Sequence, residues 1–323
     1  MELVVSAKSD TRSSRGYLIC LVGTAIWSTT AIFIRYLTER YRLPPLVLAF
    51  WRDLFVFLAL GVALLLVRRD QIKLTRARLV FFAIYGVVLA LFNSLWTFSV
   101  SFNGAAVATV LAYSSAGITA VLGWIIYKEE LDRIKILVVV FSILGCILVS
   151  GAYQISSWNL NYLGLVTGIC SGFGFAFYSL FGKEASRRNI YPWSSLLYTF
   201  GFAAFYLFIF NRVLAVFPNL TETTDLFWLG EQYHGWLTLL ILAVIPTIGG
   251  YGLYTVSLTI LPASVANLIA TLEPAFTAIL AFLFLQEMLT FVQLIGGICI
   301  VGCVILLRYH ENGRKKGSIE PSI

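Results

Sequence analysis

A Glu-Pro pair lies in the middle of one long apolar stretch, residues 265–289. An unpaired carboxylate among apolar residues is costly to bury, so Glu273 is a candidate for binding a cationic group or carrying a proton. Pro274 has no N–H and leaves the carbonyl of Ala270 without its helical partner, so we expect a kink there. The alternative is that Glu273 only satisfies the interrupted helix, and the sequence leaves both roles open.

Arg52 and Asp53 form a second charged pair inside an apolar stretch. Adjacent residues on a helix point in different directions, so the two need not pair with each other. Arg52 could hold a carboxylate or pair with Glu273, or its long side chain could extend back toward the end of the helix. For Asp53 the sequence favours a structural role, and for Arg52 the choice stays open.

Polar and aromatic side chains recur within the apolar stretches. Asn267, Thr271 and Pro274 are spaced i, i+4, i+7 and share one helix face. In lipid, such a stripe faces either a cavity or a neighbouring helix. Pro246 predicts a second kink. Aromatic belts occur at span ends, so side chains that lie away from those ends are further candidates for lining a cavity. For each of them the alternative is ordinary packing. These candidates are Trp27, Asn93, Trp96, Thr109, Tyr113, Tyr251 and Tyr254.

The composition places these residues in a membrane. Of the 323 residues, 59% are hydrophobic and 12% are charged, and the mean hydropathy is +0.87. Soluble domains carry about 25% charged residues. Apolar runs of roughly 20 residues recur along the chain, each long enough to span a bilayer as a helix, whereas barrel strands alternate over roughly ten. The sequence therefore predicts an all-α polytopic membrane protein.

Ten spans account for the apolar runs and for the basic residues. Most of the 23 lysines and arginines fall at one set of alternating span ends, so the positive-inside rule makes both termini cytoplasmic. The same rule explains the net charge of +7 without a nucleic-acid partner. Tails of 1–15 and 309–323 flank the predicted spans, which are 16–37, 45–67, 78–100, 104–126, 133–151, 161–182, 192–215, 236–258, 262–285 and 289–308.

The second half of the chain repeats the first. Residues 92–131 align with 250–289 at a shift of 158. A shift of five spans reverses the direction of each helix, so 16–151 and 161–308 predict an inverted 5+5 repeat. Secondary transporters are built from such repeats and hold their substrate near the midplane. The register pairs Asn93 with Tyr251, Trp96 with Tyr254, Thr109 with Asn267, Tyr113 with Thr271 and Ser115 with Glu273.

Several short motifs resemble those of one family, the EamA-type transporters of the drug/metabolite transporter superfamily. The resemblance covers nearly the whole chain. It implies a ten-helix fold in the plasma (inner) membrane and export of a small metabolite such as an amino acid, but no particular substrate. Family members commonly carry proline where this chain has Ala116, so the two halves could bend differently. The motifs are Trp27-Ser28, Phe50-Trp51-Arg52, Glu129-Glu130-Leu131, Leu272-Glu273-Pro274 and Glu287-Met288-Leu289.

Transport of a small-molecule substrate across the lipid bilayer by alternating access is the leading hypothesis. A sugar-nucleotide or a drug-like compound is the alternative substrate class. An integral membrane enzyme would need clustered acids, a metal set or a nucleophile with its base, and the spans contain no such set. No cofactor or metal is expected, and without a Walker motif ATP is not the energy source. Coupling to protons through Glu273, uniport, and assembly as a homodimer stay open.

Overall fold

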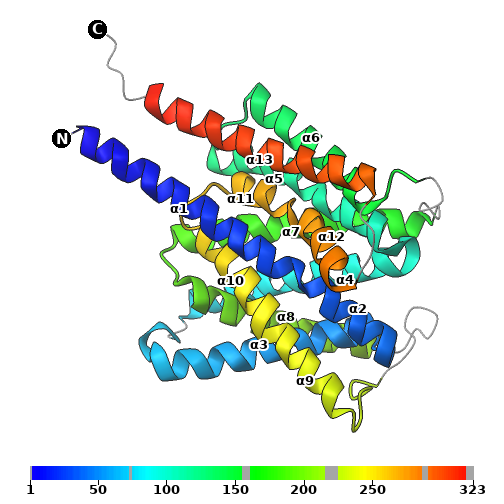
Figure 1. Cartoon of the computed structure of the whole chain (residues 1–323). Coiled ribbons are helices and arrows are strands. Elements are labelled where there is room, and N and C mark those ends of the chain that lie inside the picture. Colours follow the sequence, from blue (N-terminus) through cyan, green and yellow to red (C-terminus); the bar gives the residue numbers. More distant parts are fainter. Residues whose placement is uncertain (1, 73–74, 155–160, 215–224, 286–289, 318–323) are drawn as a thin grey trace.

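The computed structural model describes residues 2–72, 75–154, 161–214, 225–285 and 290–317, and within these ranges it contains helices but no strand. Figure 1 shows the helices as one bundle, in which segments from the two ends of the chain lie side by side. The helices are α1 Glu2–Ser28, α2 Thr30–Tyr41, α3 Pro45–Val67, α4 Arg76–Tyr113, α5 Ser115–Tyr127, α6 Arg133–Ser150, α7 Tyr162–Arg187, α8 Pro192–Leu214, α9 Tyr233–Leu242, α10 Ile248–Ser257, α11 Ala263–Ala270, α12 Glu273–Leu285 and α13 Phe291–Gly317, with a short 3₁₀ turn η1 at Arg69–Ile72 and a π-helical segment η3 at Ala243–Thr247.

Nine helical segments among the described residues are long and apolar enough to cross a membrane. The longest of them runs from Arg76 to Tyr127 over 52 residues. At about 1.5 Å per residue it would extend roughly 78 Å, more than twice the thickness of the hydrocarbon core. Gly104 interrupts it with a non-helical φ of 79° and ψ of 161°, a conformation that glycine adopts readily. The segment therefore contains two spans, and the ten predicted spans are all present.

Two spans are broken near their middle at equivalent positions of the repeat. The ninth span ends α11 at Ala270 and resumes as α12 at Glu273, as expected from Pro274. The fourth span breaks at Ser114, between α4 and α5, although Ala116 stands in the place of the proline. Ser114 Oγ donates a hydrogen bond to the carbonyl of Leu111 at 2.6 Å, and such a bond bends helices. The halves thus break alike, and proline is not needed for the break.

Two further spans are irregular. The first span is divided into α1 and α2 at Thr29, a break without a proline or glycine signal in the sequence. The eighth span has the π-helical segment η3 around Pro246, because a proline that lacks an N–H interrupts the regular ladder of hydrogen bonds. Both breaks lie in spans that contribute side chains to the cavity described below.

Helix packing between the two halves follows a two-fold relation. α1, in the first span, packs against α10, in the eighth, and α7, in the sixth, packs against α4, in the third. Replacing each span by its counterpart five spans away converts one of these pairs into the other. Two other extensive contacts, α3 with α8 and α6 with α13, join counterparts directly, whereas α4 also packs against α8. The fold is therefore an inverted 5+5 repeat, with the two halves packed against each other.

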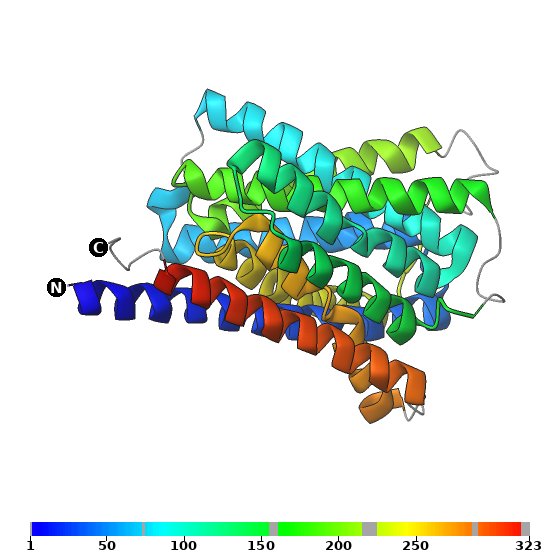
Figure 2. The same ribbon diagram turned by 90° about the horizontal axis from the view of Figure 1, so that it is seen from above.

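Both chain ends lie at the same end of the bundle, as an even number of spans requires (Figures 1 and 2). The first and last spans continue as helix into stretches expected to be tails, since α1 begins at Glu2 and α13 ends at Gly317. We call the end of the bundle that holds residues 258–262 the α10–α11 end. The opposite end holds the connection between α2 and α3.

Candidate functional site

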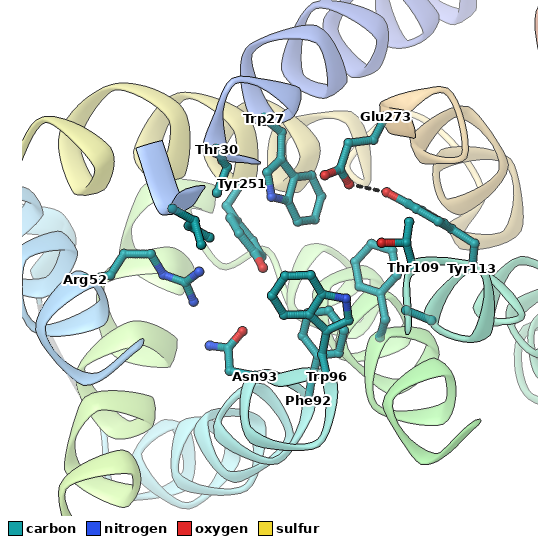
Figure 3. A pocket seen from close by; sticks show the side chains of 13 residues that line it. Trp27, Thr30, Arg52, Phe92, Asn93, Trp96, Thr109, Tyr113, Tyr251 and Glu273 are labelled. Atoms are coloured by element: carbon teal, nitrogen blue, oxygen red, sulfur yellow. Dashed lines mark hydrogen bonds between the residues drawn. The ribbon is translucent and has the colours of Figure 1, made fainter. Parts of the chain in front are cut away.

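A cavity lies between the two halves of the bundle. It contains about 580 Å³ of unoccupied space, part of it open to solvent. Most of its wall comes from the first half, and the second half adds three side chains. Figure 3 shows how the lining residues converge: Trp27, Thr30, Ile34, Arg52, Phe92, Asn93, Trp96, Thr109, Ala112, Tyr113, Phe175, Tyr251 and Glu273. Eight of the eleven pathway residues proposed from the sequence are in this set.

Arg52 enters the cavity from α3 and is paired with its sequence neighbour, not with Glu273. Its Nε donates to Oδ1 of Asp53 at 3.0 Å, and its Nη2 lies 3.0 Å from the same oxygen. Asn93 on α4 donates from Nδ2 to the other carboxylate oxygen, Oδ2, at 3.0 Å. Asp53 is fully buried. It therefore fixes the orientation of both Arg52 and Asn93.

Glu273 enters the cavity at the opposite side, as the first residue of α12. The break before it leaves free N–H groups at the start of a 13-residue helix, and the helix dipole favours a negative group there. Tyr113, the last residue of α4, donates its phenolic hydrogen to Glu273 Oε2. Thr109 lies one helical turn earlier on the same wall. The two broken spans thus meet at this hydrogen bond.

Aromatic rings fill the wall between the two charged ends. Trp27 lies against Tyr251 with ring centroids 4.2 Å apart, and Phe92 stacks on Phe175 at 5.2 Å. Figure 3 shows Trp27, Tyr251 and Trp96 between Arg52 and Glu273. Aromatic faces bind planar apolar groups and cations. The cavity can therefore receive a molecule with polar groups at its ends and an apolar body.

Three proposed pathway residues lie outside the cavity lining, in a packed cluster. Asn267 accepts a hydrogen bond from Ser115 Oγ at 3.0 Å and donates to Ser179 Oγ at 2.9 Å. Ser179 is also 2.7 Å from the hydroxyl of Tyr254. Thr271 donates its hydroxyl to the carbonyl of Leu268 at 2.6 Å. Asn267, Tyr254 and Thr271 are fully buried; the side chains of Asn267 and Tyr254 bond to neighbouring helices, whereas that of Thr271 bonds within its own segment.

At the α10–α11 end, two charged side chains hydrogen-bond the start of α11 and the connection between α10 and α11. The carboxylate of Glu129 accepts hydrogen bonds from the backbone N–H of Ala263 at 2.9 Å and of Ser264 at 3.3 Å, and from the hydroxyl of Ser264. Glu129 belongs to the first half and α11 to the second, so this cap joins the halves. Lys183 Nζ donates to the carbonyls of Leu258 and Leu261 at the end of α10. Glu287, the counterpart of Glu129, lies outside the described residues.

Five lining residues were not among the predicted set. Thr30 and Ile34 follow Trp27 by three and seven residues, so helical spacing from Trp27 would have found them. Phe92 and Ala112 each precede a residue that was proposed. Phe175 on α7 had no signal in the sequence, because a phenylalanine inside an apolar span is ordinary packing by type.

The fold and the cavity define a multi-pass membrane protein with a cavity between two inverted repeats, lined by aromatic rings and by two charged side chains. The chain matches the EamA-like transporter family twice, over residues 14–151 and over residues 162–309, and together these matches include most of its length. This chain belongs to the EamA-like transporter family. The helical membrane fold, the cavity and the family match thus all indicate a membrane transporter.

Related proteins carry names that describe transporters. An uncharacterized transporter of Synechocystis is 27% identical over 70% of this chain, and the alignment spans 65% of that protein. The uncharacterized transporter YwfM of Bacillus subtilis is 27% identical over 84% of this chain and 86% of its own. A protein of Salmonella typhimurium named as a probable amino-acid metabolite efflux pump is 24% identical, over 88% and 92%. One crystal structure, at 15% identity, shares the fold with a TM-score of 0.71 and covers 91% of this chain and 96% of its own.

Proposed function

We propose that this protein is a secondary transporter that moves a small metabolite across the plasma membrane by alternating access through the cavity. The observation that carries the proposal is an asymmetry between equivalent positions. Trp96, Thr109, Tyr113 and Glu273 line the cavity. Their counterparts in the repeat, Tyr254, Asn267, Thr271 and Ser115, are fully buried in the packed cluster.

Such an asymmetry is what an inverted-repeat transporter needs. The two halves have similar sequences, so each can adopt the arrangement that the other has here. An exchange of arrangements would close the cavity on one side of the site and open an equivalent cavity on the other. The Glu129 cap holds the α10–α11 end shut in the present arrangement. On this proposal both termini are cytoplasmic, because that places most basic residues inside, and the α10–α11 end is the cytoplasmic one.

An amino acid or a related compound is the substrate class that the site favours, and export is the direction. The cavity offers a guanidinium and a carboxylate, which complement a carboxylate and an ammonium group. The Salmonella relative is named as an amino-acid metabolite efflux pump, in keeping with this class. The family and its transporter-named relatives favour transport over catalysis. Glu273 is the group through which a proton could couple to transport.

The test is flux in proteoliposomes that contain the purified protein. Vesicles are loaded with each of the common amino acids, and efflux is followed with and without a pH gradient. We expect efflux above that of protein-free vesicles for a subset of amino acids, and its loss in Glu273→Gln. That variant keeps an acceptor for Tyr113 but cannot carry the charge. Gly302→Ala is the matched control, because the added methyl group meets no atom within 4 Å.

Four results separate the parts of the proposal. Efflux that does not depend on the pH gradient makes the protein a uniporter. Efflux that persists in Glu273→Gln removes Glu273 from the mechanism. Absence of flux for all amino acids, while sugar-nucleotides or drug-like cations are moved, replaces the substrate class. Absence of flux for all three classes contradicts the transport proposal itself.

A further inference from the structure

We propose that Arg52 is the anion-binding group of the cavity and that Glu273 is its cation-binding group, so that the site selects dipolar molecules with an acidic group at one end, a basic group at the other and a planar apolar body between them. This inference deepens the proposed function by naming a class of ligand. It rests on the hydrogen bonding of Arg52, on the way Asp53 holds it, and on the order of side chains along the cavity.

Arg52 has a buried donor that makes no hydrogen bond, although it lies beside the carboxylate of Asp53. Its side chain is only 9% exposed, and Nη2 makes no hydrogen bond to any group among the described residues. Nη2 lies close to Asp53 Oδ1, but its hydrogens are not directed at that oxygen, which Nε already occupies. A buried charged donor without an acceptor is unfavourable, and the penalty is removed when an acceptor arrives. Because the guanidinium faces the cavity (Figure 3), a bound molecule can supply that acceptor.

A planar anion is the acceptor that fits a guanidinium best. The parallel N–H bonds of arginine match the two oxygens of a carboxylate, and lysine lacks this geometry. Asp53 and Asn93 restrain the guanidinium before any molecule binds, so little freedom is lost on binding. Asp53 also neutralises Arg52 in the empty cavity, which allows a charged group to remain buried there. Asp53 is therefore a positioning residue, and Arg52 makes the contact.

The opposite end has the complementary charge. Glu273 has no cationic partner within hydrogen-bond distance among the described residues, and it accepts its hydrogen bond from the neutral hydroxyl of Tyr113. Figure 3 shows the rings of Trp27, Trp96 and Tyr251 between Glu273 and Arg52. A molecule that contacts both ends must therefore place its charges on either side of a body that lies among the rings. A ring or another flat apolar group suits that place.

Four small probes distinguish the two ends of the site. Benzoate carries the acidic group on a ring, benzylammonium carries the basic group on a ring, and 4-(aminomethyl)benzoate carries both on opposite sides of the ring. Phenylalanine carries both charges on one carbon. Binding to the purified full-length protein is measured by the rise in melting temperature and by quenching of tryptophan fluorescence, to which Trp27 and Trp96 in the wall contribute.

We expect 4-(aminomethyl)benzoate to bind more tightly than benzoate or benzylammonium, and also more tightly than phenylalanine, whose two charges on one carbon can use only one end of the site at a time. Removing one charge contact should weaken it roughly 10- to 100-fold, the usual effect of losing a hydrogen bond to a charged group. The double variant Arg52→Gln/Asp53→Asn should lose benzoate and keep benzylammonium. Glu273→Gln should do the opposite. The double variant removes both charges of the buried pair, so it leaves no uncompensated charge that would unfold the protein.

Two further variants test the roles within the cluster. Arg52→Lys keeps the charge but not the paired donors, so benzoate should bind more weakly than to the wild type and more tightly than to the double variant. Asp53→Asn leaves the buried guanidinium without its counter-charge, so benzoate should raise the melting temperature of this variant by more than that of the wild type, and benzylammonium should not. The inference is overturned if benzoate and 4-(aminomethyl)benzoate fail to bind the wild type, or if the double variant binds benzoate as well as the wild type does. Failure of flux with this binding pattern intact would overturn the transport proposal alone.

Discussion

Glu129→Gln tests whether the cap on α11 holds the α10–α11 end closed. The glutamate carboxylate accepts hydrogen bonds from two backbone N–H groups, of Ala263 and Ser264, and from the hydroxyl of Ser264. Hydrogen bonds to charged groups contribute about 1.5–3 kcal/mol, and loss of a helix N-cap costs about 1 kcal/mol. Glutamine keeps one acceptor oxygen but lacks the charge and the second acceptor. We therefore assign the substitution a cost of about 1–2 kcal/mol.

The cost falls on the closed arrangement, because the cap joins a loop of one half to a helix of the other. A change of 1–2 kcal/mol corresponds to roughly a 5- to 30-fold rise in the population open at this end. Cys20 can report that population. It is fully buried on α1, and its sulfur lies 3.6 Å from the carbonyl of Ala266 on α11. In a chain with Cys146, Cys170, Cys299 and Cys303 replaced by alanine, a small water-soluble thiol reagent should label Cys20 roughly 5 to 30 times faster after Glu129→Gln.

The adjacent acidic residue provides the control. Glu130 carries the same charge but is exposed, and the cap on α11 is made by Glu129, so Glu130→Gln should leave the labelling rate within about twofold of the parent. Equal labelling in the parent and in Glu129→Gln, with both proteins folded, would refute the closure by this cap. Equal acceleration by both substitutions would refute its specificity, because a general loss of negative charge would then explain the result.

Two predictions concern packing away from the cavity lining. Gly86→Ala should destabilise the fold by about 1–3 kcal/mol, because a Cβ there would lie 2.3 Å from the Cβ of Phe202. Thermal unfolding in detergent measures the loss of stability. A variant as stable as Gly302→Ala would contradict the prediction. Trp51→Phe removes the indole donor to the carbonyl of Leu226 at 2.6 Å and should raise amide hydrogen exchange over 226–230 about fivefold. Substitution of an exposed tryptophan, Trp124→Phe, should not raise it. Equal exchange in the wild type and in both variants would count against a role of Trp51 in holding this segment.

The membrane fold could be predicted from the sequence because lipid leaves few choices. A run of apolar residues long enough to span the bilayer must be a helix, and the 158-residue register relates the two halves through their residues alone. The breaks in the spans were predictable only where proline marks them. Pro274 and Pro246 are such signals, whereas Ser114 and Thr29 break their spans through serine or threonine back-bonding, which a single sequence does not reveal.

The types of residue that line the cavity could be predicted, but not which of two equivalent residues in the repeat would line it. Polar residues within spans must face a cavity or a neighbouring helix, and that rule identified Arg52, Asn93, Thr109 and Glu273. It also identified Asn267, which bonds neighbouring helices instead. Position 109 and position 267 are equivalent in the repeat, so no pattern could tell which one lines the open side. That choice depends on the arrangement that the two halves have adopted.

One position differs between the halves in a way that bears on energy coupling. Ser115 in the packed cluster corresponds to Glu273 in the cavity, and Asn267, its hydrogen-bond partner, corresponds to Thr109. On the proposed mechanism, the exchanged arrangement would bring Glu273 into packed surroundings like those of Ser115 here. A hydroxyl is easily buried in such a place, but a carboxylate requires a compensating charge or a proton. The exchange would then proceed only when Glu273 is neutralised, either by the basic group of a bound molecule or by a proton. The single carboxylate, present in one half and absent from the other, is thus where coupling of transport to an ion would arise.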